Sequence, residues 1–285
     1  MKRLLSAVAV ILALAACSNG TASSTSASFA PAPSEPAASS SFANLTVLKI
    51  GATAAPHAEV LEFAAPLLEE KGVKLEITVF DDYVLPNTAL DQGDLDANYF
   101  QHYPYLEYFN QQNGTDIISA ANIHYEPLGV YPGRGAELAS IADGAQVAIP
   151  NDGSNEARAL YLLEAQGLIK VDHSVGYEAT KLDVTENPKK LELVELDADK
   201  IPAALKDVDF AVINGNYAIA AGVNNTVLVT EDPNGESALT YANIIAIRPE
   251  DKDSAAIRTL IEVLQGKEVS DFMLGKYQGS VVPIK

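Results

Sequence analysis

The sequence predicts an α/β protein whose globular part is divided into two lobes, and three observations support this prediction. Segments with strand and helix periodicity alternate in the first half of the chain, a break near Pro127 to Gly135 interrupts them, and a second alternating set follows. A last strand and helix have no partner of their own at the C-terminus, so we expect them to return to the first lobe. The predicted boundaries are 46–128 and 242–285 for the first lobe and 129–241 for the second.

The first lobe opens with a β-α-β pattern, which favours a parallel sheet. Apolar alternation indicates the strands, and apolar residues at helical spacing, closed by a glycine, indicate the helix. The predicted elements, in chain order, are a strand at Leu45 to Gly51, a helix at His57 to Lys71, a strand at Leu75 to Phe80, a helix at Pro86 to Gly93 and an extended segment at Asp94 to Phe100.

The second lobe repeats this alternation. Its first strand runs into a polar loop and then into a segment of strong helix formers, so the loop precedes a helix N-terminus. Two α/β lobes joined by more than one crossing strand place a ligand cleft between them. The elements that we predict are strands at Gln146 to Pro150, Leu191 to Leu196 and Phe210 to Ile213, helices at Asn155 to Gln166 and Ile201 to Leu205, and the returning strand Tyr241 to Ile247 with the amphipathic helix Ser254 to Gln265.

The N-terminus has the pattern of a lipoprotein signal peptide, which we place at 1–17. A basic start precedes the mainly apolar run Leu4 to Ala16, which is too short to span a bilayer. Small residues then lead to Cys17, the only cysteine of the chain, whose thiol can accept a diacylglyceryl group. We predict lipidation of Cys17 and a membrane anchor, followed by a flexible linker at 18–45 rich in Ser, Ala, Thr and Pro. A chance cysteine after an ordinary signal peptide is the alternative.

Composition excludes several classes of function. The net charge of −19 argues against nucleic acid as a partner, because its phosphates would be repelled. No nucleophile elbow, phosphate-binding glycine loop or zinc-type histidine spacing is present, so we expect no enzyme, no cofactor and no metal site. The four histidines are scattered along the chain at His57, His102, His124 and His173.

Three groups of residues are candidates for ligand binding. Residues 96–105 contain three tyrosines, a phenylalanine and a histidine, which either line a pocket or form a core patch. Arg158, near the start of a predicted helix, can face a carboxylate together with backbone N–H groups, or it can pair with a glutamate on the helix surface. Asn214 and Asn216 follow a buried-type strand and can accept hydrogen bonds from an ammonium group, although a simple turn explains them equally well.

Several separated segments, taken together, resemble one known family. They are Gly51-Ala52-Thr53, Pro56-His57-Ala58-Glu59, Phe80-Asp81-Asp82-Tyr83-Val84-Leu85-Pro86-Asn87, Leu95-Asp96-Ala97-Asn98-Tyr99-Phe100-Gln101-His102, Ile149-Pro150-Asn151-Asp152, Asn155-Glu156, Arg158-Ala159-Leu160 and Ala211-Val212-Ile213-Asn214. In this order they resemble the NlpA family of methionine-binding lipoproteins, from about Leu48 to the C-terminus.

The resemblance implies a two-lobed periplasmic-binding-protein fold of type II that closes around L-methionine or a close analogue. It also implies that the protein delivers this ligand to an ABC permease driven by a separate ATPase. The protein would be lipid-anchored and extracytoplasmic, in the periplasm or on the outer face of the membrane, and we expect it to be a monomer. Site residues carried over from the family are Tyr83, Phe100, His102 and Tyr105 for the thioether, Arg158 for the carboxylate, and Asn155 and Asn214 for the amino acid backbone. The chain departs from the family's pattern in the loop at Asp152 to Ser154 and at Gly215, where a hydroxyl residue is usual.

The sequence is also compatible with other functions. One is a binding lipoprotein for another amino acid, a dipeptide or a metal ion, and another is a surface lipoprotein used for adhesion. An enzyme built on a similar two-lobed fold would need a cleft acid or base, which no spacing indicates.

Overall fold

The computed structural model describes residues 45–235 and 237–284. The predicted signal peptide, the predicted lipidation site Cys17 and almost all of the predicted linker lie outside the described residues. Within the described residues, no helix is both long and apolar enough to cross a membrane.

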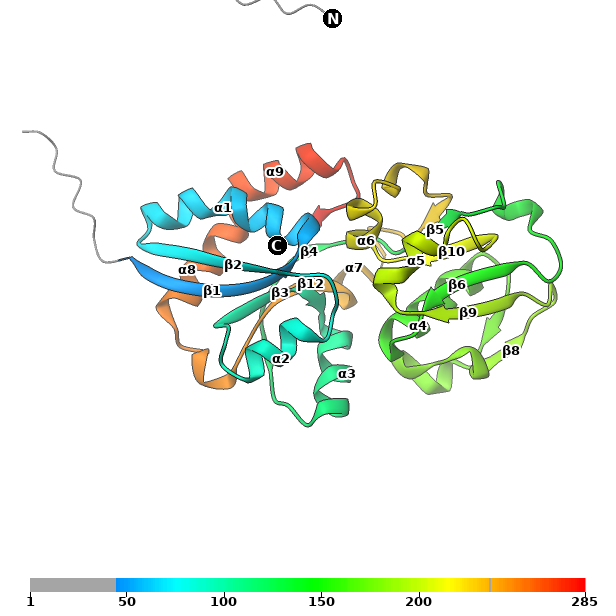
Figure 1. Cartoon of the computed structure of the whole chain (residues 1–285), viewed down its shortest axis with the longest axis horizontal. Coiled ribbons are helices and arrows are strands. Elements are labelled where there is room, and N and C mark those ends of the chain that lie inside the picture. Colours follow the sequence, from blue (N-terminus) through cyan, green and yellow to red (C-terminus); the bar gives the residue numbers. More distant parts are fainter. Residues whose placement is uncertain (1–44, 236, 285) are drawn as a thin grey trace, which may run out of the picture. The chain divides into compact units, whose positions relative to one another are not determined.

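The first lobe is built on a six-stranded mixed sheet with the order β13-β4-β12-β3-β1-β2 (Figure 1). β1 pairs in parallel with β2 and β3, whereas β12 is antiparallel to both β3 and β4. The C-terminal strand β12 therefore joins the sheet formed by the N-terminal part of the chain. The strands are β1 (Thr46–Thr53), β2 (Val73–Phe80), β3 (Ala97–His102), β4 (Ile118–Tyr125), β12 (Ala242–Ile247) and β13 (Val282–Pro283).

Helices cover both faces of this sheet. Alternate residues of β12 show this directly, since Ile245 belongs to the core under α1, α8 and α9, and Ile244 to the core under α2 and α3. The side chain of Ser254 caps α8 by accepting a hydrogen bond from the Ile257 backbone. The helices are α1 (Glu59–Glu70), α2 (Leu85–Asp91), α3 (Tyr103–Asn113), α8 (Ala255–Leu264) and α9 (Lys267–Tyr277).

The second lobe contains a five-stranded sheet with the order β11-β5-β10-β6-β9 and a small two-stranded ribbon of β7 and β8. The predicted break near Pro127 to Gly135 contains β5, which pairs antiparallel with β10. α4 packs on one face of the sheet, and α5 and α6 pack on the other. The strands are β5 (Gly129–Pro132), β6 (Gln146–Pro150), β7 (Lys170–Val171), β8 (Val184–Glu186), β9 (Glu192–Leu196), β10 (Phe210–Ile213) and β11 (Val229–Thr230); the helices are α4 (Gly153–Ala165), α5 (Ile201–Ala204), α6 (Gly215–Ala220) and α7 (Ser237–Thr240).

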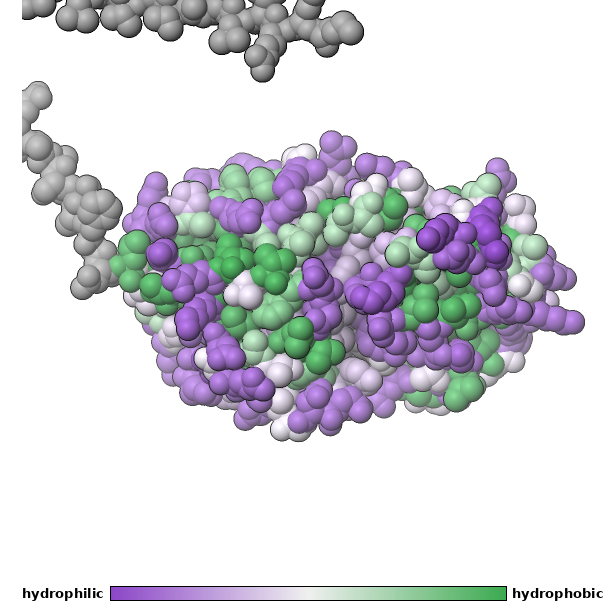
Figure 2. All heavy atoms as spheres, in the orientation of Figure 1, coloured by the Kyte–Doolittle hydropathy of each residue, from purple (hydrophilic) through white to green (hydrophobic). Residues whose placement is uncertain are grey.

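Short helical turns complete the secondary structure. They are η1 (Ala54–Ala58), η2 (Leu138–Ser140), η3 (His173–Glu178), η4 (Lys181–Asp183), η5 (Ala198–Lys200), η6 (Asn224–Thr226) and η7 (Pro249–Asp251). The visible surface is mostly hydrophilic, with apolar residues interspersed among charged ones (Figure 2). This distribution agrees with the acidic composition.

Two segments carry the chain between the sheets. Residues 126–128 lead from β4 to β5, and residues 231–241 lead from β11 to β12. Each segment begins with a glutamate, Glu126 in the first and Glu231 in the second. Because both segments cross between the lobes, these two carboxylates lie where the lobes meet.

Candidate functional site

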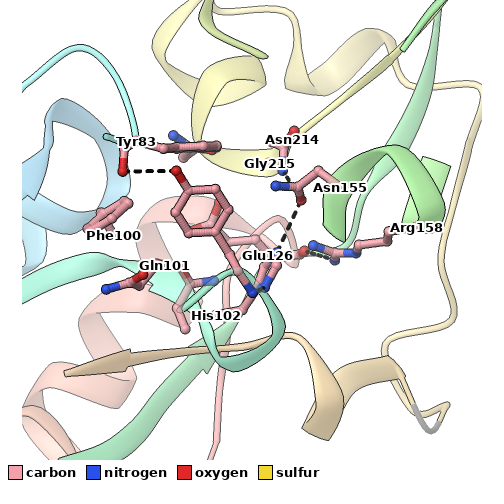
Figure 3. Close-up of a pocket in the computed structure, with 12 residues that line it drawn as sticks. Tyr83, Phe100, Gln101, His102, Glu126, Asn155, Arg158, Asn214 and Gly215 are labelled. Carbon is pink, nitrogen blue, oxygen red and sulfur yellow. Dashed lines mark hydrogen bonds between the residues drawn. The ribbon is translucent and has the colours of Figure 1, made fainter. Parts of the chain in front are cut away.

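A cavity lies between the two lobes, where two-lobed proteins commonly bind small molecules (Figure 3). All seven ligand-binding residues that the sequence predicts line this one cavity. Five further residues complete its wall. The lining consists of Tyr83, Phe100, Gln101, His102, Tyr105, Glu126, Asn155, Arg158, Asn214, Gly215, Asn216 and Asn243.

Aromatic rings form one side of the cavity. The ring centroid of Tyr83 lies 5.7 Å from that of Phe100, 5.5 Å from that of Tyr105 and 4.9 Å from that of Tyr217. The Tyr83 hydroxyl donates to Asn216 Oδ1 at 2.6 Å, across the two lobes. Since the hydroxyl groups of Tyr83 and Tyr105 both donate to protein acceptors, the rings can offer apolar surface to a ligand.

His102 ends β3 and is held by hydrogen bonds from both sides. Its Nδ1 accepts from the Tyr105 backbone N–H at 3.2 Å, capping α3, so its Nε2 carries the proton and donates to Asn155 Oδ1 at 3.1 Å. Burial, with a smaller contribution from the nearby Arg158 charge, lowers the pKa of His102 to about 3. His102 is therefore a neutral residue that positions Asn155.

Asn214 extends this row of hydrogen bonds (Figure 3). Its Nδ2 donates to Asn155 Oδ1 at 2.8 Å, so this oxygen accepts from both Asn214 and His102. The other side-chain atom, Asn214 Oδ1, is buried and has no hydrogen-bond partner among the described residues. A buried acceptor without a partner costs about 1–3 kcal/mol. The cavity thus contains an amide oxygen that is available to accept a hydrogen bond from a ligand.

The loop before α4 sets the position of Asn155. Asp152 is the N-cap of α4, and its Oδ1 accepts from both the backbone N–H of Asn155, at 3.0 Å, and Asn155 Nδ2, at 2.9 Å. A Cβ atom at Gly153 would lie 2.7 Å from the ring of Tyr108, so this close approach needs glycine. Although this loop departs from the family's usual sequence, it therefore still fixes the orientation of Asn155.

Arg158 is buried and is not a surface arginine, although it does pair with a glutamate. Its Nε donates to Glu231 Oε1 at 2.8 Å and its Nη2 to Glu231 Oε2 at 2.6 Å, while Nη2 also donates to the backbone oxygen of Glu126. The guanidinium carbon lies 4.3 Å from the centroid of the Tyr241 ring. Burial by itself lowers the pKa of Arg158, but the Glu231 carboxylate outweighs it and raises the pKa. One edge of the guanidinium is therefore occupied before any ligand arrives.

Glu126 is a cavity residue that the sequence interpretation missed. It is buried, which raises its pKa to about 6 against the opposing effects of His57 and Arg158. A Cβ atom at Gly215 would lie 2.7 Å from the Glu126 Cβ and 2.9 Å from its Oε2, so Gly215 makes room for this carboxylate. Gly215 thus stands in place of the family's usual hydroxyl residue at the position where Glu126 packs.

Two of the histidines that are scattered in the sequence meet at Glu126. His124 Nε2 lies 2.7 Å and His57 Nε2 lies 3.3 Å from the same oxygen, Glu126 Oε1. Burial lowers the pKa of His57 to about 4 and that of His124 to about 3, so both are neutral. Spacing could not reveal this cluster, because the sheet brings His57, which follows β1, next to the distant residues His124 and Glu126 at the end of β4. A histidine and a glutamate two residues apart at a strand end were the only local signal.

Comparison with known proteins places the chain in a family. The model of the NlpA lipoprotein family matches residues 48–285. The chain belongs to the NlpA lipoprotein family. This confirms the resemblance seen in the sequence.

Curated relatives and solved structures agree with this assignment. The chain is 38% identical over 256 residues to the probable D-methionine-binding lipoprotein MetQ of Pasteurella multocida, covering 89% of each chain. It is 40% identical to the methionine-binding lipoprotein MetQ of Bacillus subtilis, covering 82% of this chain and 87% of that one. A nutrient binding protein from Burkholderia cenocepacia bound to methionine is 43% identical with a TM-score of 0.80, covering 84% of this chain and all of that one. The two-lobed periplasmic-binding-protein fold is thereby confirmed.

Proposed function

We propose that this chain is the extracytoplasmic binding lipoprotein of an ABC importer and that it captures methionine in the cavity between its lobes. The observation that carries the proposal is the unpartnered Asn214 Oδ1, buried in a cavity with aromatic rings on one side and charged groups on the other. Methionine has the matching parts, a soft apolar thioether and a zwitterionic end. The names of the relatives support methionine as the ligand.

The aromatic side of the cavity suits the thioether. Sulfur atoms make favourable contacts with aromatic rings, worth about 0.3–1.5 kcal/mol each. Tyr83, Phe100 and Tyr105 present such rings. We therefore place the methionine side chain against these three residues.

The polar side suits the ammonium group. Arg158 forms an ion pair with Glu231, whereas the Glu126 carboxylate lies against the neutral His57 and His124, so an ionised Glu126 adds negative charge to this side of the cavity. A ligand ammonium would balance this charge and would donate to Asn214 Oδ1 as well. Both effects favour binding of the cationic end in this region.

The carboxylate of the ligand is left for Arg158. The hydrogen bonds of Arg158 to other described residues use Nε and Nη2, which leaves Nη1 for a ligand oxygen. Glu231 fixes the plane of the guanidinium, so this donor is oriented before binding. In this role Glu231 is a positioning residue for the carboxylate contact.

Calorimetric titration tests the proposal. The mature lipoprotein, in detergent and freed of carried-over ligand by unfolding and refolding, is titrated with L-methionine, D-methionine and the other amino acids. One-to-one binding of methionine is expected, and norleucine, which replaces the sulfur by a methylene, should bind more weakly. Binding of another amino acid without methionine would overturn the specificity, and no binding of any amino acid would overturn the transport role.

The partners follow from the same proposal. We infer that Cys17 anchors the mature chain by its lipid and that the ligand-bound monomer docks on a methionine permease whose ATPase is a separate chain; the chain itself performs no reaction. Replacing Cys17 by Ala should move the protein from the membrane fraction to the soluble fraction. Membrane association of that variant after a salt wash would contradict lipid anchoring.

A further inference from the structure

A buried cluster of three metal-ligating side chains lies behind the wall of the cavity. His57, His124 and Glu126 each offer one donor atom, and these atoms lie within 4.8 Å of one another. His57 comes from η1, directly after β1, His124 comes from β4, and Glu126 follows β4. Among the described residues this is the one group of at least three such side chains with converging donor atoms.

The distances are close to those of a tetrahedral cation site. Donor atoms bonded at about 2.1 Å to a tetrahedral ion lie about 3.4 Å apart. Here His57 Nε2 lies 3.3 Å and His124 Nε2 lies 2.7 Å from Glu126 Oε1, and Asn243 Oδ1 lies 2.9 Å from His57 Nε2. An ion could enter with movements of a few tenths of an ångström to about an ångström, and Asn243 could occupy the fourth position.

The outer hydrogen bonds also fit metal coordination. A ligating histidine usually holds its second ring nitrogen against a fixed oxygen. His57 Nδ1 lies 2.8 Å from Thr53 Oγ1, and His124 Nδ1 contacts the hydroxyl of Tyr99. A hydroxyl group can accept as well as donate, so each histidine can carry its proton on Nδ1 and leave Nε2 free for an ion. Both histidines thus have an oxygen that can fix the tautomer metal binding needs.

We propose that His57, His124 and Glu126 form a binding site for a divalent transition-metal cation of the Zn²⁺ class. Two imidazoles and one carboxylate are the donor set that such ions take in proteins. Glu126 and Asn243 also line the cavity, which gives the ion a path to the otherwise buried histidines. The site stands apart from the methionine proposal, because none of its evidence depends on which solute the cavity binds.

Metal titration of the mature protein tests the site. The protein is treated with EDTA, dialysed, and titrated with Zn²⁺ while bound metal is measured by elemental analysis. One Zn²⁺ per chain is expected, and His124→Gln should weaken its binding at least about 100-fold, since it removes a ligand. His173→Gln, which changes an exposed histidine that pairs with Glu164, should bind Zn²⁺ as the wild type does. Absence of Zn²⁺ binding, or binding unaffected by His124→Gln, would overturn the proposal.

Two further measurements test the site if His124→Gln does not fold. Tyr99→Phe keeps the ring and removes only the hydroxyl against His124 Nδ1, so it should weaken Zn²⁺ binding about 10–100-fold. Co²⁺ added to the wild-type protein should give the intense visible bands of a four-coordinate ion. The weak spectrum of hexa-aqua Co²⁺ alone would contradict the site without the use of any variant.

Discussion

The unpartnered oxygen of Asn214 leads to a prediction in which ligand affinity and protein stability separate. In the ligand-free protein, Asn214→Ala removes one hydrogen bond, from Nδ2 to Asn155 Oδ1, worth about 0.5–1.5 kcal/mol. The same substitution removes the buried Oδ1 that has no partner, and thereby a cost of about 1–3 kcal/mol. Because these effects have opposite signs, the free energy of unfolding should change by between a loss of about 0.5 kcal/mol and a gain of about 2.5 kcal/mol.

The affinity for methionine should change much more. A hydrogen bond between the ligand ammonium and Asn214 Oδ1 involves a charged donor and is worth about 1.5–3 kcal/mol. At about 1.4 kcal/mol for each factor of ten, Asn214→Ala should raise the dissociation constant about 10- to 150-fold.

Two measurements separate the effect of the substitution on ligand affinity from its effect on protein stability. Calorimetric titration gives the dissociation constant for methionine, and urea unfolding without ligand gives the free energy of unfolding. Asn225→Ala, an exposed asparagine in η6, is the matched control and should change neither quantity. The reasoning is refuted if Asn214→Ala leaves the affinity unchanged, or if it destabilises the ligand-free protein by 3 kcal/mol or more.

Three other predictions concern neighbouring contacts. Arg158→Ala should abolish measurable methionine binding and destabilise the protein by about 3–5 kcal/mol, because it leaves the buried Glu231 charge unpaired. The double variant Arg158→Met with Glu231→Leu removes both charges, so urea unfolding should show restored stability while methionine binding stays lost. Tyr83→Phe should weaken methionine binding about 2- to 10-fold by removing the 2.6 Å bond to Asn216, whereas Tyr103→Phe, on an exposed tyrosine, should not; equal affinities in calorimetry would contradict this role. Burial raises the pKa of Glu231, but the Arg158 charge outweighs burial, so folding lowers this pKa. The ionised Glu231 therefore stabilises the protein above about pH 4.5, and this stabilisation is lost as the pH falls through the pKa of the folded state. Glu231→Gln should flatten the pH dependence of the free energy of unfolding below about pH 4.5, and an unchanged slope would contradict this role.

Much of the fold could be predicted because local patterns determine its main elements. The strands at Gln146–Pro150 and Phe210–Ile213 have the predicted bounds, since continuous apolar runs mark strands buried on both faces. β4 was not predicted, because its sequence mixes Ser, Asn and His with apolar residues. Helices α3 and α9 were not predicted either; α3 begins inside the aromatic cluster, and α9 has polar residues around most of its surface. The proposed lobe boundaries stay a prediction.

The candidate site shows what sequence patterns leave out. Asn155 and Arg158 lie on successive turns of α4, and Phe100 and His102 lie on one strand, so local reasoning could single them out. The partners of these residues come from far along the chain. Glu231 is 73 residues from Arg158, and Asn243 is 186 residues from His57. Such pairings depend on the sheet order, which no local periodicity specifies.

The two segments that cross between the lobes explain the charge of the cavity. Glu231, on the second segment, is neutralised by Arg158, whereas Glu126, on the first, contacts two neutral histidines. This difference leaves Glu126 as a buried carboxylate that forms no ion pair with a lysine or arginine among the described residues. A ligand ammonium on the cavity side and a divalent ion on the histidine side would both draw on that same charge. Since both cations would be attracted to this one carboxylate, occupation of one position should weaken binding at the other, and because binding free energies are reciprocal the factor is the same in both directions.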